Sequence, residues 1–390
     1  MRLLIVSSRF PYPLEKGDKL RLYYQIQELS KHFEIVLLSL SDRLVSEEEK
    51  SVLKPYCKSI HVYQLTWPSI LFNIIKGYSK GLPAQIAYFF DQKVKKQIDK
   101  LLEEEKPDHI YCQLIRASEY VKAQTTPKTL DFMDCFSLNS HKRAMHSNFW
   151  TKWFWRIESK RLKKYESLIY PLFDHHTIIS TVDAQALALK TDQSLTTISN
   201  GIADRFFEKS EKFRDIDILF LGNLSYYSNV KAVEFFINEI TPILMEKNKS
   251  LHIVIAGAHP SRKIKRWIGH HSPISLMADV PDTKEIYQRT KVFIAPITLG
   301  TGQQNKVLEA IASGCEVVCS AEVSTGLQPI AAHLSIARNS SEYAQIVIQK
   351  GNKYDQNNEI RIKAIERVRQ SFNWEINTMD LVNLIKNQKK

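Results

Sequence analysis

Short runs of aliphatic and β-branched residues alternate with amphipathic segments, and this alternation begins at the first residue of the chain. Arg2 to Ser8 predicts a buried strand, Lys19 to Lys31 predicts an amphipathic helix, and Glu34 to Leu40 predicts a second strand. Strands separated by helical crossovers are typical of parallel sheets covered by helices on both faces. The chain is therefore predicted to have an α/β fold.

The alternation runs through the chain twice. Further strands of a first doubly wound sheet are predicted at Ile60 to Leu65, His109 to Gln113, Thr129 to Phe132, His176 to Ile179 and Thr196 to Ser199. A second set is predicted at Ile216 to Leu221, His252 to Ala256, Ile274 to Leu276, Val292 to Ala295 and Glu316 to Cys319. Because 390 residues exceed what one core supports, we expect two Rossmann-like domains.

The first domain is expected over residues 1–207 and the second over 215–372, joined by a linker at Glu208 to Arg214. Residues 373–390 hold one more helix, roughly Trp374 to Lys386, which has no strand of its own to cover. We expect this helix to cross back to the first domain.

Composition excludes several protein classes. No apolar run reaches the roughly 18 residues that a membrane-spanning helix needs, and Leu3 to Val6 is too short for a signal-peptide core. The five cysteines include no C-x-x-C pair, so we interpret them as reduced core residues and not as disulfides or zinc ligands. The chain is expected to stay in the cytoplasm.

The most informative segment is P-I-T-L-G-T-G-Q-Q-N-K-V-L-E-A-I-A-S-G, from Pro296 to Gly314, which follows a strand and opens a helix. Gly300 and Gly302 permit close backbone approach, and the helix start offers N–H groups to an anion. Lys306 adds a positive charge, and Glu309 lies one turn further on the same helix face. The alternative is an ordinary loop-to-helix junction with a surface ion pair.

This segment resembles the nucleotide-sugar-binding signature of the family-four GT-B glycosyltransferases. Further motifs occur in the order that this family has them: P-Y-P followed by Gly17 and Arg21, then N-G-I-A-D-R-F-F, F-L-G-N-L-S-Y-Y-S-N-V, A-G-A-H-P and A-D-V-P-D. The resemblance covers nearly the whole chain. It implies a GT-B fold, in which two Rossmann-like domains face each other across a cleft.

The resemblance also implies a donor site for a UDP- or GDP-linked sugar, a retaining reaction and no obligatory metal. Lys306 and the backbone of Gly302 to Gln304 would hold the diphosphate, Glu309 would bind ribose or sugar hydroxyls, and the loop around Val280 would face the base. The expected donor-binding residues are Gly222, Asn223, Val280, Gly300, Thr301, Gly302, Gln303, Gln304, Lys306 and Glu309.

Two positions depart from the family pattern. Thr301 stands where the family has the first glutamate of its E-x7-E pair. Asn223, followed by Ser228 and Asn229, stands where many members have an arginine and a lysine near the diphosphate. These departures leave the donor sugar and the charge partners open.

Candidate catalytic groups in the first domain lie in D-F-M-D-C-F-S, directly after a strand. Asp131 and Asp134 are three residues apart, so both carboxylates could face the cleft, with Asp134 preferred; the alternative is that one of them caps a helix. Arg21, after the Gly17 loop, is expected to contact an acceptor or a phosphate unless it forms a surface salt bridge. Asp215 and Asp217 form a D-x-D pattern that we interpret as a solvated strand end.

The net charge of +12 is concentrated in one segment. Residues 142 to 165 contain eight basic side chains and one acidic one. Lys152, Arg156, Lys160 and Lys163 form a stripe beside an aromatic face that includes Trp150 and Trp153, as in helices that lie on anionic membranes. The alternative is that this segment is a core helix whose aromatic side chains pack inside the first domain. Trp67 to Phe90 is a second apolar segment with few charges.

The predicted function is transfer of a sugar, with Lys306 stabilising the leaving diphosphate, to a lipid-linked or glycan acceptor in cell-surface polysaccharide or glycolipid assembly. The expected location is the inner face of the cell membrane, with an anionic membrane surface as partner and no nucleic acid. Two alternatives remain: a nucleotide-sugar epimerase of the same fold, or a non-catalytic membrane- or nucleic-acid-binding module.

Overall fold

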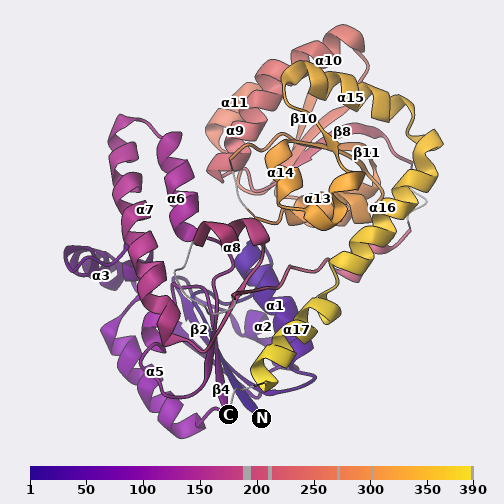
Figure 1. Cartoon of the computed structure of the whole chain (residues 1–390). Coiled ribbons are helices and arrows are strands. Elements are labelled where there is room, and N and C mark those ends of the chain that lie inside the picture. Colours follow the sequence, from indigo (N-terminus) through magenta and orange to yellow (C-terminus); the bar gives the residue numbers. More distant parts are fainter. Residues whose placement is uncertain (188–194, 210–212, 270–272, 300–301, 388–390) are drawn as a thin grey trace. The chain divides into compact units, whose positions relative to one another are not determined.

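The computed structural model describes the chain except for residues 188–194, 210–212, 270–272, 300–301 and 388–390 (Figure 1). The chain folds into two compact units. The first unit contains Met1–Ser199 together with Trp374–Lys390, and the second contains Asn200–Asn373.

The first unit is built on a parallel sheet. Its described residues form seven strands in the order β3-β2-β1-β4-β5-β6-β7. These strands are β1 (Arg2–Ser7), β2 (Glu34–Ser41), β3 (Ser59–Gln64), β4 (His109–Gln113), β5 (Lys128–Asp131), β6 (His175–Ile178) and β7 (Leu195–Thr197). The order reverses between β1 and β4, as in doubly wound folds.

Helices cover the two faces of this sheet (Figure 1). They are α1 (Gly17–Leu29), α2 (Glu47–Ser51), α3 (Trp67–Ser79), α4 (Ala84–Phe89), α5 (Gln92–Glu105), α6 (Phe136–Met145), α7 (Phe149–Ile169), α8 (Thr181–Leu187) and α17 (Trp374–Lys386). The central strand β1 is buried from Leu3 to Val6, because both faces of the sheet are covered.

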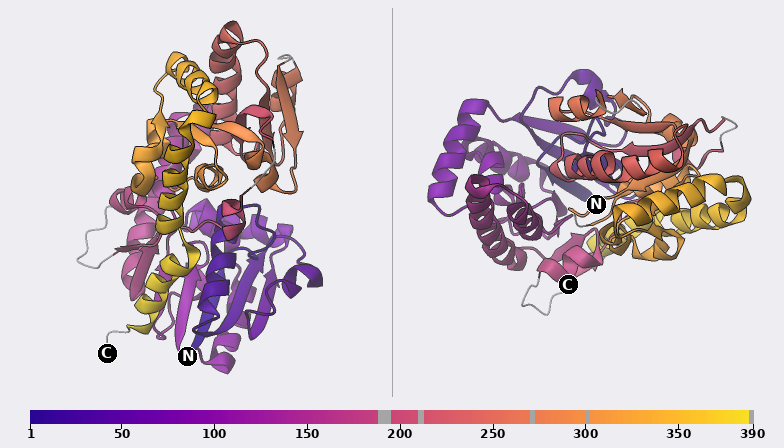
Figure 2. Two further views of the ribbon diagram at one scale, coloured as in Figure 1. Left: turned by 90° about the vertical axis from the view of Figure 1, so that its right-hand side faces the viewer. Right: turned by 90° about the horizontal axis from the view of Figure 1, so that it is seen from above.

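The C-terminal helix α17 packs beside α1 in the first unit (Figures 1 and 2). Leu381 and Val382 share a hydrophobic cluster with Leu22 of α1. The rings of Tyr24 and Trp374 stack with their centroids 5.1 Å apart. Burial of these apolar side chains against α1 explains why the last segment of the chain belongs to the first unit.

A buried ion pair connects the elements of the first unit. Arg21 Nε on α1 donates to Asp131 Oδ2 at the end of β5 over 2.7 Å, and neither side chain has exposed surface. The same carboxylate accepts from Tyr111 Oη at 2.8 Å and Thr177 Oγ1 at 3.0 Å, and Arg21 also donates to the carbonyl of Ile198. One charged pair therefore joins α1 to β4, β5, β6 and the residue after β7.

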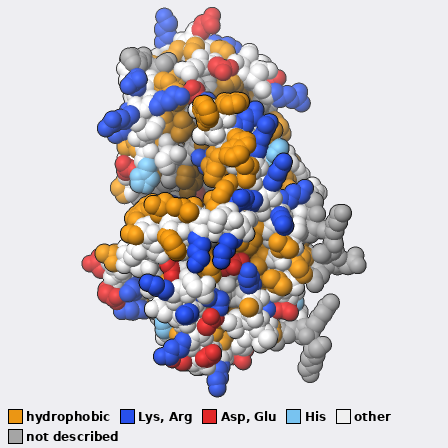
Figure 3. Space-filling view, turned by 90° about the vertical axis from the view of Figure 1, so that its left-hand side faces the viewer, with side chains coloured by type: hydrophobic (Ala, Val, Ile, Leu, Met, Phe, Trp, Pro, Cys, Tyr) orange, Lys and Arg blue, Asp and Glu red, His pale blue; other side chains and the backbone are white. Residues whose placement is uncertain are grey.

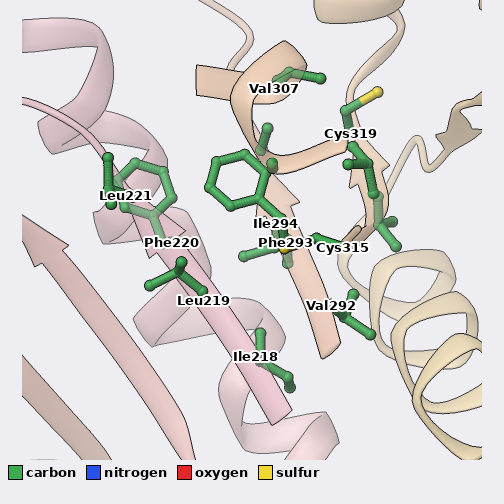
Figure 4. Close-up of a cluster of buried hydrophobic side chains, with 14 of the residues drawn as sticks. Ile218, Leu219, Phe220, Leu221, Val292, Phe293, Ile294, Val307, Cys315 and Cys319 are labelled. Atoms are coloured by element: carbon green, nitrogen blue, oxygen red, sulfur yellow. The ribbon is translucent and has the colours of Figure 1, made fainter. Parts of the chain in front are cut away.

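The second unit repeats the architecture. Its described residues form a parallel sheet of six strands in the order β10-β9-β8-β11-β12-β13. The strands are β8 (Ile216–Leu221), β9 (Ile253–Gly257), β10 (Ile274–Ala278), β11 (Thr290–Ala295), β12 (Glu316–Cys319) and β13 (Ser335–Ile336). The core between the sheet and its helices includes Phe220, Phe293, Cys315 and Cys319 (Figure 4).

The helices of the second unit lie between these strands and after them. They are α9 (Tyr227–Phe235), α10 (Thr241–Lys247), α11 (Arg262–Gly269), α12 (Thr283–Gln288), α13 (Asn305–Ala312), α14 (Ala321–Thr325), α15 (Ser340–Asn352) and α16 (Asn358–Ser371). A short π-helical turn, Phe236–Ile240, joins α9 to α10.

The predicted α/β fold is confirmed, and each predicted strand is present within two residues at either end. Strand β13 was not predicted, because two residues are too few to show an alternating pattern. The second unit begins at Asn200, before the expected boundary at 207. The expected linker lies partly outside the described residues, and Arg214 at its end donates to the carbonyl of Ser313 at 2.7 Å, which anchors it in the second unit.

The D-x-D carboxylates are paired at the start of β8. Asp215 binds Arg289 and Asp217 binds Lys291, so both belong to ion pairs at the edge opposite to the carboxyl ends of the strands. Four of the five cysteines are buried and all five are free thiols. Among the described residues no cluster of His, Cys, Asp and Glu could hold a metal ion.

The buried pair predicts a strong effect on stability. Replacing Asp131 with alanine leaves the Arg21 guanidinium buried without its counter-charge, and the free energy of unfolding of the first unit is expected to fall by about 3–5 kcal/mol. Chemical denaturation would measure this. Glu47→Ala removes one partner of the exposed Lys50–Glu47 pair and serves as the control, with no measurable change expected. Equal stability of Asp131→Ala and wild type would contradict this role of the pair.

Candidate functional site

The carboxyl ends of β8, β9, β10 and β11 lie at one edge of the second sheet, because all four strands run parallel. The segments that follow these strands contain the predicted donor-binding residues of this unit. Ligands of open parallel sheets bind at this edge. The geometry of these segments therefore decides what the second unit can bind.

The loops after β8 and β9 approach each other very closely. A Cβ atom on Gly257 would lie 1.7 Å from the carbonyl oxygen of Gly222, and Gly257 has a φ of +149°. Only glycine can hold this position. The loop after β10 contacts the loop after β9, since the backbone N–H of His259 donates to Asp279 Oδ1 at 2.8 Å. We call the loops after β8, β9 and β10 together the platform.

Lys306 on α13 reaches over this platform. Its Nζ donates to Asn229 Oδ1 at 2.6 Å, and Asn229 Nδ2 donates to the carbonyl of Asn223 at 2.8 Å. A Cβ atom on Gly222 would lie 3.2 Å from the same Nζ, so the glycine leaves room for the ammonium group. Burial lowers the pKa of Lys306 to about 7, which means that this cation lacks its usual solvation.

Glu309 lies one turn further along α13 and is half-buried. Tyr287 Oη donates to its Oε2 at 3.3 Å. Burial raises the pKa of Glu309 to about 7, against the opposing effects of the Tyr287 hydrogen bond and the charges of Arg205 and Lys306. A carboxylate and an ammonium group, both poorly solvated, thus stand side by side on one helix.

The start of α13 is uncapped by side chains. Gln304 occupies the N-cap position without a side-chain hydrogen bond, and Gly302 before it has a φ of +84°. Backbone N–H groups at a helix start favour an anion, which complements Lys306, the second residue of α13. The predicted residues Gly300 and Thr301 lie outside the described residues.

Two of the predicted donor-binding side chains are engaged elsewhere. The Gln303 amide binds both the backbone N–H and the carbonyl of Asn200, at 2.9 and 3.0 Å. Asn223 Oδ1 accepts from the backbone N–H and the hydroxyl of Ser225. These side chains shape the loops of the site, and only their backbones remain candidates for a donor. Val280 follows β10 and packs against the core of the unit.

Sequence reasoning missed the roles of Asn229 and Tyr287. Asn229 appeared only as a departure from a family pattern, although it is the residue that holds the Lys306 ammonium group. Tyr287 lies 22 residues before Glu309 in the chain, and no spacing rule connects them. A buried tyrosine requires a hydrogen-bond partner, but the sequence does not say which residue provides it.

The first unit presents Asp134 after β5. It is half-buried, and the preceding residue Met133 has a φ of +59° that turns the chain sharply. Burial, followed by the charges of Asp183 and Asp131, raises the pKa of Asp134 to about 7. Such a carboxyl group can exchange a proton near neutral pH.

Two predictions for the first unit do not fit the structure. Asp131 was expected to face the cleft as a catalytic group and Arg21 to contact an acceptor or a phosphate, but both side chains are fully buried in their mutual ion pair. Burial without this pairing would be too costly for either charge, which accounts for their structural role. Gly17, the first residue of α1, is exposed.

The predicted membrane patch is divided between core and surface. The second half of α7 is a core element that buries Leu162, Tyr165 and Ile169. Its first half exposes Trp150 and Trp153. Arg156, Lys160 and Lys163 are also exposed, while Lys152 is half-buried. The core-helix alternative is therefore wrong for the first half of α7.

Residues 215–349 match the model of the family "Glycosyl transferases group 1". This chain is a glycosyltransferase. The matched segment contains the whole platform described above, from Gly222 to Glu309. The glycosyltransferase is also 21% identical over 390 residues to the "Uncharacterized 44.6 kDa protein in cps region" of Klebsiella pneumoniae, covering 95% of this chain and 96% of that protein.

Solved structures establish that the glycosyltransferase has the GT-B fold. The crystal structure of TarM matches 99% of both chains with a TM-score of 0.73 and 12% identity. Anabaena HepE in complex with UDP matches 99% of this chain and 100% of that one, with a TM-score of 0.68 and 13% identity. The match to this family favours a sugar transferase over the epimerase and the non-catalytic binding module.

The contact of the β8 and β9 loops in this glycosyltransferase gives a test of the platform. In Gly257→Ala the new Cβ would overlap the Gly222 carbonyl, so the free energy of unfolding of the second unit is expected to fall by about 3 kcal/mol or more. Gly269→Ala is the matched control, because nothing lies within 4 Å of its added Cβ, and it should change stability by less than about 1 kcal/mol. A stable Gly257→Ala variant would show that the two loops are further apart.

Proposed function

We propose that this glycosyltransferase moves a sugar from a UDP- or GDP-linked donor, bound in the second unit, to a lipid-linked or glycan acceptor. The observation that carries the proposal is the Lys306 ammonium group, held by Asn229 over Gly222 beside the start of α13. A desolvated cation next to free backbone N–H groups suits a diphosphate. HepE is related in fold and was solved in complex with UDP, which supports a donor of this class.

The chemistry required is departure of a nucleoside diphosphate from the anomeric carbon. Lys306 and the N–H groups of α13 would stabilise the negative charge that develops on the diphosphate. Glu309 would accept hydrogen bonds from ribose or sugar hydroxyls. We infer retention of anomeric configuration and no obligatory metal from the family resemblance.

On the acceptor side, Asp134 is the proposed catalytic group of the first unit. Its raised pKa allows it to orient the acceptor hydroxyl group or to take its proton as the new glycosidic bond forms. A glycan-like acceptor is supported by a TarM variant that was crystallised with alpha-GlcNAc-glycerol and UDP. The cps-region relative supports a place in polysaccharide assembly.

The proposal includes work at a membrane, on its cytoplasmic side. Trp150 and Trp153 project from α7 with a basic stripe beside them, which suits a lipid interface and a lipid-linked acceptor. No helix among the described residues is long and apolar enough to cross a bilayer.

Donor binding tests the proposal directly. Isothermal titration of UDP- and GDP-linked sugars, with a chelator present, should show that the wild-type protein binds one nucleotide class at about micromolar affinity. Lys306→Met and Glu309→Gln should each weaken this binding at least about tenfold, because each variant loses a charged contact with the donor. Asp134→Asn should keep donor binding and lose at least about a hundredfold in turnover.

The matched control for donor binding is Lys231→Met, which removes an exposed lysine of α9 that pairs with Glu234. It should leave affinity and turnover unchanged. Failure of every nucleotide sugar to bind the wild-type protein would overturn the donor site. Binding that requires a divalent metal would overturn the metal-free part of the proposal.

The two pKa values near 7 predict that donor affinity peaks close to neutral pH. Lys306 must be protonated and Glu309 ionised to bind the donor, whose diphosphate does not titrate in this range. Affinity should therefore fall as pH rises above about 7, where Lys306 loses its proton, and fall as pH drops below about 7, where Glu309 gains one. Titrations between acidic and alkaline pH would measure both limbs.

Two variants test the decrease in donor affinity at high pH and at low pH separately. Lys306→Arg carries a permanent charge and should remove the decrease at high pH. Glu309→Gln cannot ionise and should remove the decrease at low pH, at a lower affinity throughout. If both variants retain the wild-type pH profile, other groups control the binding.

A further inference from the structure

Helix α3 exposes an apolar face. Trp67, Leu71, Phe72 and Ile75 have between 61% and 68% of their surface accessible. Their spacing of four, one and three residues places them on one side of the helix. A surface helix of a globular protein normally turns its polar side outward, so this orientation needs a reason.

Packing fixes α3 in this orientation. A Cβ atom on Gly77 would lie 2.6 Å from the Cβ of Ala87, so α3 lies tightly against α4. On the inner side Ile70 is buried, and Asn73 Nδ2 donates to Asp91 Oδ2 at 3.2 Å. The helix therefore keeps a polar contact inside and four large apolar side chains outside.

The C-terminal end of α3 packs against α7. Arg161 Nη1 of α7 donates to the carbonyl of Tyr78 at 2.7 Å, and the rings of Tyr78 and Phe154 stack with centroids 6.4 Å apart. On the first two turns of α7, Phe149, Trp150 and Trp153 are 70% to 85% exposed. We call this combined area the α3–α7 surface. Figure 3, which looks at the side that carries both helices, shows hydrophobic and basic side chains next to each other.

The charge of this surface has one sign. The only acidic residues in α7, Glu158 and Glu166, are both buried. Glu158 accepts from the backbone N–H groups of Ala84 and Gln85 at the start of α4, and Glu166 accepts from that of Ser137 at the start of α6. Both carboxylates are thus used as helix caps inside the unit.

Four of the six basic residues of α7 are exposed. Arg156, Lys160, Lys163 and Lys164 of α7 and Lys76 of α3 are exposed, and neither α3 nor α6 contains an acidic residue. A cationic surface with Trp and aliphatic side chains projecting from it complements an anionic bilayer, where phosphates meet the cations and the acyl boundary takes the apolar groups. A nucleic acid bound to the same cations would not cover Leu71 and Ile75, which would stay exposed to water.

We propose that the α3–α7 surface is a lipid-docking surface for anionic membranes, in which α3 inserts its apolar face and α7 adds interfacial tryptophans and cations. This extends the proposed membrane association to a second helix, and it is independent of the transfer chemistry. Docking would bring the first unit, where the proposed acceptor group Asp134 lies, to the lipid surface.

Co-sedimentation with vesicles tests the proposal, using phosphatidylcholine alone and an equimolar mixture with phosphatidylglycerol. The wild-type protein should bind the anionic vesicles only, and less at high salt. Phe72→Ser with Ile75→Ser in α3, Trp150→Ser with Trp153→Ser in α7, and Arg156→Glu with Lys160→Glu should each reduce partitioning at least about tenfold.

The controls are Ile360→Ser with Ile362→Ser, which removes two exposed apolar side chains of α16, and Lys265→Glu with Arg266→Glu, which reverses two exposed charges of α11. Both should bind vesicles as the wild type does. Titration with the donor sugar should give the same affinity in all variants, which separates loss of docking from loss of fold or of the donor site.

Three results would overturn the proposal. The first is a wild-type protein that ignores anionic vesicles. The second is an α3 variant that partitions like the wild type, which would leave docking to α7 alone. The third is a protein that does not bind vesicles but self-associates or binds RNA, and loses that binding with the α3 substitutions. This result would make the surface an interface for a macromolecule.

Discussion

Parallel strand pairing is the constraint on which the rest of this structure depends. A parallel sheet needs a crossover after every strand, so all the loops that follow strands gather at one edge while the helices cover both faces. In the second unit this edge brings together Gly222, Gly257, Asp279 and the start of α13, which are far apart in the chain. In the first unit the same rule places Asp134 after β5.

Burial of charge serves two different purposes in this protein. Arg21 and Asp131 are fully buried, but each satisfies the other, and the pair connects several elements of the first unit. Lys306 and Glu309 are desolvated without forming such a pair with each other, and both pKa values move to about 7. A buried charge that is hydrogen-bonded only to neutral groups can still interact with a charged or polar ligand. This contrast separates the structural pair from the candidate donor site.

Helix α7 shows how one element can serve the core and the surface at once. Its second half packs into the first unit, its two carboxylates cap other helices, and four of its six cations remain in solvent. The two glutamates of α7 are buried, so they do not balance the positive charge of its basic residues at the surface. Together with the outward apolar face of α3, this gives one side of the unit the chemistry of a lipid interface.

The sequence by itself determined the α/β fold, the positions of the strands and the position of the candidate donor segment. Hydrophobic periodicity depends on local spacing, and the motif around Lys306 and Glu309 lies within one strand–loop–helix unit. Only the tertiary structure decided which polar residues meet across the chain. Arg21 and Asp131 looked like site residues because charged groups after strands often are, and only their mutual burial shows otherwise. Asn229 and Tyr287 gained their roles through contacts with α13 that no sequence pattern encodes, because side-chain partners across a sheet edge are set by packing and not by spacing.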